Sequence, residues 1–353
     1  MLNDRYQDNF NLIRLIAALM VLVGHGFIVM GDNIPTFLGI EISVFGVMVF
    51  FSISGYLVAE SWIRDPSVMR YLARRSLRIF PALIVLVLLT TFLLGPLLTN
   101  LSLKDYFTSI ETYAYLENIF LSLHLSLPGV FENNPQHLKI NLSLWSLNVE
   151  FLMYLLLPVI LLFKGRRNGL IFAIITILLS ITLTFLQIHV LGGGGRRGYL
   201  GDFNLTKEAR FFMAGVAMRY IMGGKVIPLA WASSIFIFTV GVYYLSPFNY
   251  YFFNILLAFA LPCFINTFGE SSEVRLPGLN KLGDISYGVY LYAFPIQQII
   301  AQFFIGKISV LTSIIFATIP TVFIAYLSWH LIEKNALTLK PTIKKNQTKA
   351  SSF

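Results

Sequence analysis

The chain has little charge and almost no cysteine. Only 12% of its 353 residues are Asp, Glu, Lys or Arg, whereas 56% are hydrophobic. A soluble domain has roughly 25% charged residues, so this composition excludes an ordinary soluble protein. The single cysteine, Cys263, excludes a disulfide framework. The five histidines show no metal-ligand spacing such as His-Glu-x-x-His, and we therefore expect no metal centre.

Long apolar runs, in contrast, recur along the whole chain. Each has about 20 residues, which as a helix matches a hydrocarbon core of ~30 Å. The runs are continuous rather than alternating, which excludes a transmembrane β-barrel. We predict an all-α, polytopic transmembrane helical bundle with ten spans, at residues 10–30, 38–60, 78–99, 147–163, 169–190, 207–223, 227–246, 250–268, 284–305 and 309–333.

The basic residues between the spans predict the orientation. With the N-terminus in the cytoplasm, eighteen of the 26 Lys and Arg residues fall in cytoplasmic loops and six on the outer side. The positive-inside rule therefore places both termini in the cytoplasm. This asymmetry also accounts for the net charge of +9, so we expect no nucleic-acid partner.

Two parts of the chain are distinguished by composition. Residues 1–337 form the predicted transmembrane domain, within which residues 100–146 make an outer segment that is long enough for short helices but not for an independent domain. Residues 338–353 contain four lysines among polar residues, which is typical of a disordered basic tail near anionic lipid.

Two ionisable residues share the first span. Arg14 and His25 are eleven residues apart, roughly 20° past three full helical turns. Both side chains therefore project from nearly the same face, ~16 Å apart along the axis. A charge at the bilayer centre costs at least ~2.5–3.5 kcal/mol on insertion scales, so this pair predicts a functional path within the membrane.

Four arginines, Arg70, Arg74, Arg75 and Arg78, are expected in the inner loop just before the third span. Guanidinium groups bind phosphate in bidentate geometry, and a cluster of them favours a di- or triphosphorylated ligand. The alternative is that these charges only orient the chain in the membrane. Every charge in this loop after Asp65 is arginine and none is lysine, which favours the first interpretation.

Further polar residues occur inside or at the ends of the spans. Ser54 lies beside Gly55, where small residues permit close helix packing, or where the hydroxyl binds a ligand in a narrow channel. Glu150 lies about one turn inside the fourth span and needs a positive partner, for which Arg210 and His25 are the candidates.

Two other sets of residues flank these positions. Trp145 is predicted to anchor the fourth span at the interface, and Tyr154 lies one turn beyond Glu150. His330 and Glu333, one turn apart at the cytoplasmic end of the last span, are expected to form a solvated pair rather than a metal site.

These motifs, in this order, resemble the membrane-bound acyltransferase-3 family, which includes bacterial O-antigen, peptidoglycan, exopolysaccharide and Nod-factor O-acetyltransferases. The resemblance covers nearly the whole chain. It is carried by Arg14 with His25, Phe-Phe-Ser-Ile-Ser-Gly-Tyr-Leu at 50–57, Arg75 and Arg78 before Ile-Phe-Pro, and Trp-Ser-Leu at 145–147 with Glu150. Weaker matches lie at 211–215, 285–291 and 332–334.

Three positions depart from the family pattern. Relatives often have an acidic residue where Met48 stands, a histidine at the position of Ala293 and a proline at the position of Asn335. We therefore leave these positions outside the catalytic assignment. Many relatives also carry an extracytoplasmic esterase-like domain after the bundle, which we do not expect here.

The resemblance implies a bacterial inner-membrane enzyme that takes an acetyl group from cytoplasmic acetyl-CoA and gives it to a sugar hydroxyl on the outer side. Arg75 and Arg78, with Arg74 in support, would hold the CoA phosphates, and Arg14 would lie on the way to His25, a general base or an acyl relay. Glu150 would orient His25 or neutralise Arg210. Ser54, Trp145, Tyr154 and Arg210 would line the substrate path.

A transporter or flippase of a lipid-linked saccharide is the alternative, because buried Arg, His and Glu residues also occur in such proteins. Transporters are often built from two similar halves. The motifs at 50–55 and 75–78 have no counterpart after residue 200, which favours the enzyme. A purely structural or receptor-like protein would leave Arg14 and His25 on one face unexplained.

Overall fold

The computed structural model describes residues 4–161, 205–222, 227–245, 250–271 and 283–341, with isolated residues between 167 and 182. Its helices are α1 (Asp4–Val29), α2 (Ile42–Arg64), α3 (Val68–Leu89), α4 (Gly95–Leu98), α5 (Leu103–Thr108), α6 (Ile110–Ala114), α7 (Leu144–Leu161), α9 (Leu205–Met222), α10 (Leu229–Leu245), α11 (Tyr250–Glu270), α13 (Ser286–Phe304), α14 (Val310–Ser328) and α15 (Lys334–Thr338). Two π turns, η1 (Thr90–Leu94) and η3 (Trp329–Glu333), and the 3-10 helix η2 (Tyr115–Phe120) interrupt or join them.

The all-α class is confirmed, since strand structure in the described residues is limited to the short antiparallel pair β1 (Thr36–Phe37) and β2 (Ile40–Glu41). Five described helical segments are long and apolar enough to cross a membrane: Asn9–Val29, Ile42–Arg64, Val68–Leu98, Phe252–Glu270 and Val310–Thr338. Described helices cover nine of the ten predicted spans, and the fifth, 169–190, lies largely outside the described residues. The number of spans and the side of the termini stay predictions.

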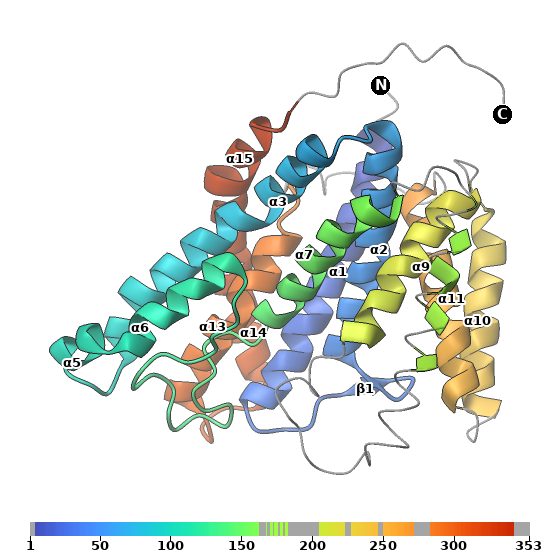
Figure 1. Cartoon of the computed structure of the whole chain (residues 1–353). Helices are drawn as coiled ribbons and strands as arrows, with labels where there is room; N and C mark the ends of the chain where they lie inside the picture. The colour runs from blue at the N-terminus through green and yellow to red at the C-terminus, as the bar shows by residue number, and fades with distance from the viewer. Residues whose placement is uncertain are drawn as a thin grey trace.

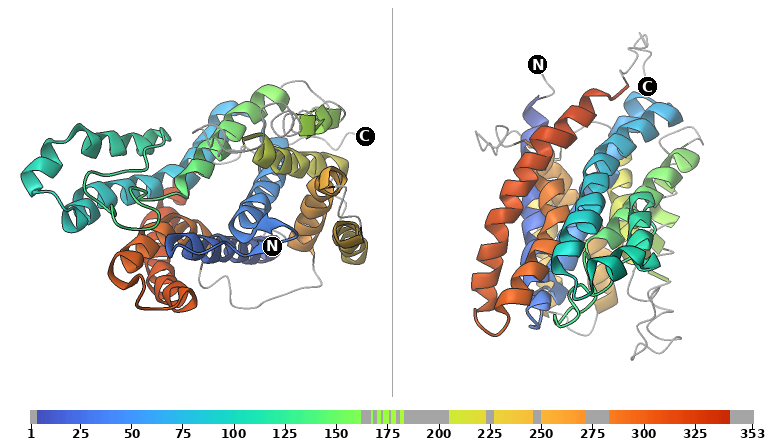
Figure 2. Two further views of the ribbon diagram at one scale, coloured as in Figure 1. Left: turned by 90° about the horizontal axis from the view of Figure 1, so that it is seen from below. Right: turned by 90° about the vertical axis from the view of Figure 1, so that its left-hand side faces the viewer.

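The helices form a bundle around α1 and α2, with the α2–α3 corner and α15 at one end and the β1–β2 hairpin at the other (Figure 1). Helix α1 packs against α2, α11 and α13, and α13 pairs with α14 (Figure 2). Helices α2 and α9 lie in close backbone contact, because both present glycine there. A Cβ on Gly55 would lie 1.9 Å from the carbonyl oxygen of Phe212, and one on Gly215 would lie 2.3 Å from that of Ser52.

Helix α3 begins at Val68, ten residues before the predicted start of the third span. Its arginines therefore lie on the first turns of a helix, and the prediction that they occupy a loop is wrong. Arginine, leucine and alanine favour helix, and the segment from Val68 to Arg78 contains no glycine or proline to interrupt it. This arrangement gives each guanidinium a fixed direction along α3.

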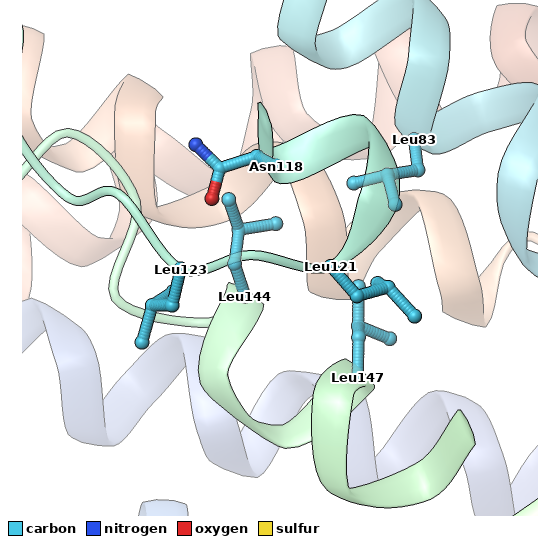
Figure 3. Close-up of a pocket in the computed structure, with 6 residues that line it drawn as sticks. All are labelled: Leu83, Asn118, Leu121, Leu123, Leu144 and Leu147. Carbon is cyan, nitrogen blue, oxygen red and sulfur yellow. The ribbon is translucent and has the colours of Figure 1, made fainter. Parts of the chain in front are cut away.

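Residues 100–146, the predicted outer segment, contain the short helices α5, α6 and η2 and pack back against the bundle. The buried Tyr106 donates its hydroxyl hydrogen to the carbonyl of Thr91, 2.8 Å away on the π turn η1. Figure 3 shows the junction, a small pocket in which Asn118 lies among five leucines, from α3 (Leu83), from α7 (Leu144 and Leu147) and from the outer segment (Leu121 and Leu123). The outer segment thus braces the start of α7.

Candidate active site

A carboxylate joins two of the predicted arginines. The Oδ2 atom of Asp284, just before α13, lies 3.1 Å from Nη1 of Arg14 and 2.6 Å from Nη2 of Arg78. Ser286 donates to the other oxygen at 2.6 Å. Asp284 is buried, and a buried carboxylate requires such partners. The structure thus brings α1, α3 and the start of α13 together. We call Arg14, Arg78, Asp284 and Glu333 the charged cluster.

Glu333 lies on the other side of Arg78. Its Oε2 atom is 3.6 Å from Nη1 of Arg78, and its Oε1 atom accepts a hydrogen bond from Ser328 at 3.0 Å. Glu333 is buried, so the expected solvated pair with His330 is wrong, and His330 contacts the carbonyl of Tyr326 instead. A π turn inserts one residue relative to α-helical spacing, and η3 thereby directs Glu333 inward.

Two aromatic rings complete the surroundings of Arg78. Its guanidinium carbon is 5.6 Å from the ring centre of Tyr287 and 5.8 Å from that of Trp329. Such contacts stabilise a cation and restrict its rotation. The Arg78 side chain is therefore held in place by acids and rings, and it is still about one-fifth exposed.

The remaining arginines of α3 divide into two groups. Arg70 and the buried Arg74 bind Asp65 at the α2–α3 corner, with Arg70 Nη2 at 2.5 Å and Arg74 Nη1 at 2.8 Å from its oxygens. Hydrogen bonds from Arg70 and Arg74 hold the pKa of the Asp65 carboxyl well below its usual range. Arg75 lies instead 5.9 Å from the ring centre of Tyr154, and its buried Nε has no hydrogen-bond partner within the described part of the chain.

Glu150 is bound by two hydroxyl groups. Ser54 of α2 donates to its Oε1 at 2.6 Å, and Tyr154, one turn along α7, donates to the same atom at 2.5 Å. For His25 and Arg210, the two partners expected from sequence, the structure describes hydrogen-bond contacts with Ser143 and Asn254. Three predicted residues, Ser54, Glu150 and Tyr154, therefore meet beside Arg75.

His25 lies further along α1 in a closely packed site. The residue is 7% exposed, and its Nδ1 is 3.5 Å from the Oγ of Ser143. Its ring meets that of Phe294 edge-on, with 5.2 Å between the ring centres. The flanking glycines allow this packing. A Cβ on Gly24 would lie 2.7 Å from the Cβ of Ser43, and Gly26 is similarly confined. The histidine on α1 thus packs against α13 and the segment before α7.

Two predicted residues lie elsewhere. Arg210 is buried on α9, with its Nη2 3.3 Å from Oδ1 of Asn254 on α11 and its guanidinium 4.9 Å from the ring centre of Phe211. Trp145 is half-buried at the start of α7 and packs against the core. Neither shares a described contact with the charged cluster.

Three residues of the site, Asp284, Glu333 and Ser143, were not predicted as site residues from the sequence. The sequence did contain an indication for Asp284. This residue precedes the long apolar run of α13, and a lone carboxylate beside such a run needs a cation. No local signal marks Ser143, which lies in a short polar segment before α7.

Comparisons with known proteins identify the family. The acyltransferase domain family matches residues 7–330. The chain is 32% identical over 341 residues to a protein of Shigella phage Sf6 called O-acetyl transferase, covering 93% of this chain and 96% of the phage protein. It is 28% identical to nodulation protein 10 of Rhizobium leguminosarum bv. viciae, covering 96% of this chain and 95% of that protein. No solved structure matches.

The chain therefore belongs to the acyltransferase-3 family, and it is a multi-pass membrane acyltransferase. This confirms the resemblance inferred from the motifs and the assignment as an enzyme. The relatives support membrane O-acetylation as the reaction class.

Proposed function

We propose that the protein transfers an acetyl group from cytoplasmic acetyl-CoA to a hydroxyl of an extracytoplasmic or lipid-linked sugar, at the bacterial inner membrane. The observation that carries the proposal is the arrangement of α1, which has Arg14 in the charged cluster and the buried His25 about three turns further along. The names of the two relatives support acetyl transfer.

The donor end of this path comprises Arg14, Arg75 and Arg78. Arg14 and Arg78 share one carboxylate oxygen, so each guanidinium keeps further N–H groups for an anion. Arg75 contributes a buried Nε without a hydrogen-bond partner in the described part of the chain. These donors fit the phosphates of CoA, and the acyl-carrying arm then extends along α1 towards His25. Arg74, bound to Asp65, supports this site by fixing the start of α3.

Glu150 acts on the donor side in this proposal. Its carboxylate accepts from Ser54 and Tyr154, and Arg75 lies over the ring of the same Tyr154. In this proposal the carboxylate balances the charge of Arg75. Trp145 and Arg210 stay predicted contacts of the acceptor.

His25 performs the chemistry in this proposal. A ring nitrogen takes the proton of the acceptor hydroxyl while the oxygen attacks the thioester carbonyl. The new oxygen–carbon bond forms, the carbon–sulfur bond breaks, and the imidazolium returns its proton to the departing CoA thiolate. The alternative is an acyl relay, in which His25 itself carries the acetyl group between donor and acceptor.

The test uses purified protein in liposomes, labelled acetyl-CoA and a surface polysaccharide or its lipid-linked precursor as acceptor. His25→Ala should lower acetyl transfer by at least ~10²-fold, the lower range for loss of a general base. His137→Ala, which removes an exposed histidine of the outer segment, should leave it unchanged. Transfer by folded His25→Ala at the wild-type rate would refute the proposal. Labelled protein formed without acceptor would favour the relay, and saccharide movement without release of free CoA would favour the transporter.

A further inference from the structure

The segment before α7 holds His25 through a single side chain. Ser143 is fully buried, and its Oγ lies 3.5 Å from Nδ1 of His25. This is a long contact for a hydrogen bond, and catalytic hydrogen bonds commonly shorten when substrate binds. Among the described residues it is the one polar side-chain contact of the imidazole, because the other close neighbour, Phe294, offers a ring edge.

Ser143 is itself fixed at its backbone N–H and at its carbonyl. Its backbone N–H donates to Oδ1 of Asn141 at 3.1 Å, and its carbonyl accepts from the hydroxyl of Tyr290 at 2.9 Å. Asn141 in turn donates to the carbonyl of Leu291 at 2.8 Å. The Tyr290 hydroxyl is also 2.5 Å from Oγ of Ser146. Residues 141–146 are therefore bound to α13 near its start, at Tyr290 and Leu291.

Helix α13 is bound to α1 beside the same histidine. The Nε2 of Gln297 donates to the carbonyl of Leu22 at 2.6 Å, one turn before His25. On α13, Tyr290, Phe294 and Gln297 follow at helical spacing and share a face. The hydroxyl of Ser143 and the ring of His25 thus belong to one connected framework of α1, α13 and the segment before α7.

We propose that Ser143 is a positioning residue that accepts a hydrogen bond from Nδ1–H of His25 and leaves Nε2 as the reactive nitrogen. The inference rests on the proposed function of His25. A neutral imidazole has one N–H and one unprotonated nitrogen, and the hydrogen bond at one nitrogen selects the state of the other. If Ser143 donated to Nδ1 instead, Nε2 would carry the proton and would be unable to accept one.

The kinetic test compares Ser143→Ala, Ser143→Thr and a matched control, Ser313→Ala. Ser313 is also buried, and within the described part of the chain its hydroxyl bonds a carbonyl of its own helix, that of Val310 at 2.7 Å. Ser143→Ala should lower kcat about tenfold to hundredfold without changing KM for acetyl-CoA, and should move the acid limb of the kcat–pH profile to lower pH, because the imidazolium loses an acceptor. Threonine should restore most of the activity, and Ser313→Ala should match wild type.

A second readout does not depend on activity. Asparagine at position 25 keeps an N–H near the position of Nδ1, and glutamine keeps one near that of Nε2. His25→Asn should therefore have a higher thermal unfolding midpoint than His25→Gln, and the difference should disappear when Ser143 is replaced by Ala. Equal midpoints in the wild-type background, or a folded Ser143→Ala with the wild-type kcat, would overturn the inference.

The two proposals fail in different ways. Wild-type transfer by His25→Ala would remove the proposed role of His25, whatever Ser143 does. An inactive His25→Ala beside a fully active, normally folded Ser143→Ala would leave the proposed function standing and would reject only the role of Ser143.

Discussion

Replacing Asp65 by Asn tests whether the α2–α3 corner fixes the arginines of α3. Asp65 is buried between Arg70 and the buried Arg74, at 2.5 and 2.8 Å. Asparagine keeps the shape and one acceptor oxygen, but it leaves the Arg74 charge buried without a counter-charge. Breaking a buried pair in this way costs ~3–5 kcal/mol. The pair with Arg70, whose side chain is 35% exposed, adds at most ~1 kcal/mol.

We therefore expect Asp65→Asn to lower the free energy of unfolding by about 3 kcal/mol, the lower end of that range, because asparagine still accepts one hydrogen bond. At ~2 °C per kcal/mol for a chain of this size, the unfolding midpoint should fall by about 6 °C. KM for acetyl-CoA should rise as well, since Arg75 and Arg78 follow on the same helix. Asp32→Asn, at an exposed aspartate, is the matched control and should change neither quantity.

The pH dependence of this stabilisation follows from the direction in which the pKa of Asp65 is shifted. Hydrogen bonds from Arg70 and Arg74 hold the pKa of Asp65 below its ordinary value of 3.8. The stabilisation is therefore fully present above pH 3.8 and is lost as the pH falls through the lower pKa of the folded protein. The midpoint difference between wild type and Asp65→Asn should be constant from about pH 5 to 8 and shrink below pH 3.8. A difference under 1 °C at pH 7, measured by scanning fluorimetry in detergent, would refute this account of the corner.

Three further substitutions test the packing and the donor site. Gly55→Ala would place a Cβ 1.9 Å from a carbonyl of α9 and should destabilise the protein by ~1–3 kcal/mol. Gly241→Ala, whose new Cβ would have nothing within 4 Å, should stabilise it by ~0.5–1 kcal/mol. Equal unfolding midpoints of the two variants would contradict the close α2–α9 contact. Asp284→Asn should lower kcat/KM for acetyl-CoA about tenfold, because Arg14 loses the carboxylate that it shares with Arg78 of α3. A higher affinity for acetyl-CoA in this variant would show instead that the carboxylate competes with the donor. Glu150→Gln should lower kcat/KM by a similar factor, since it removes a charged acceptor of two hydroxyl groups, and unchanged donor kinetics would limit this residue to packing.

Local periodicity predicted the helices and the shared face of Arg14 and His25, because both depend only on spacing along the chain. The partner of Arg14 was not predictable in this way, since Asp284 is 270 residues away and pairing at that distance depends on tertiary packing. Glu333 was misassigned for a different reason. Its inward direction depends on the π turn η3, which α-helical spacing does not anticipate.

The start of α3 shows the same limit at the level of an element boundary. Hydropathy places a span where apolar residues begin, and the arginines from Arg70 to Arg78 delay that point by ten residues. The helix nevertheless starts at Val68. Its first residues have a high helix propensity, and the hydrogen bonds of Arg70 and Arg74 to Asp65 stabilise the first turns, although these turns are not apolar.

Helices α1 and α13 are tied together at two levels: Asp284, just before α13, holds Arg14, and Phe294 touches His25. The ~16 Å between the two positions on α1 is therefore a fixed length, set by rigid helices rather than by flexible loops. Under the proposed function this length selects donors by the distance between their phosphates and their reactive carbonyl. A donor is accepted when its phosphates and its reactive carbonyl are separated by that span, so a compact acyl donor such as acetyl phosphate would bind at the arginines and present its carbonyl far from the histidine.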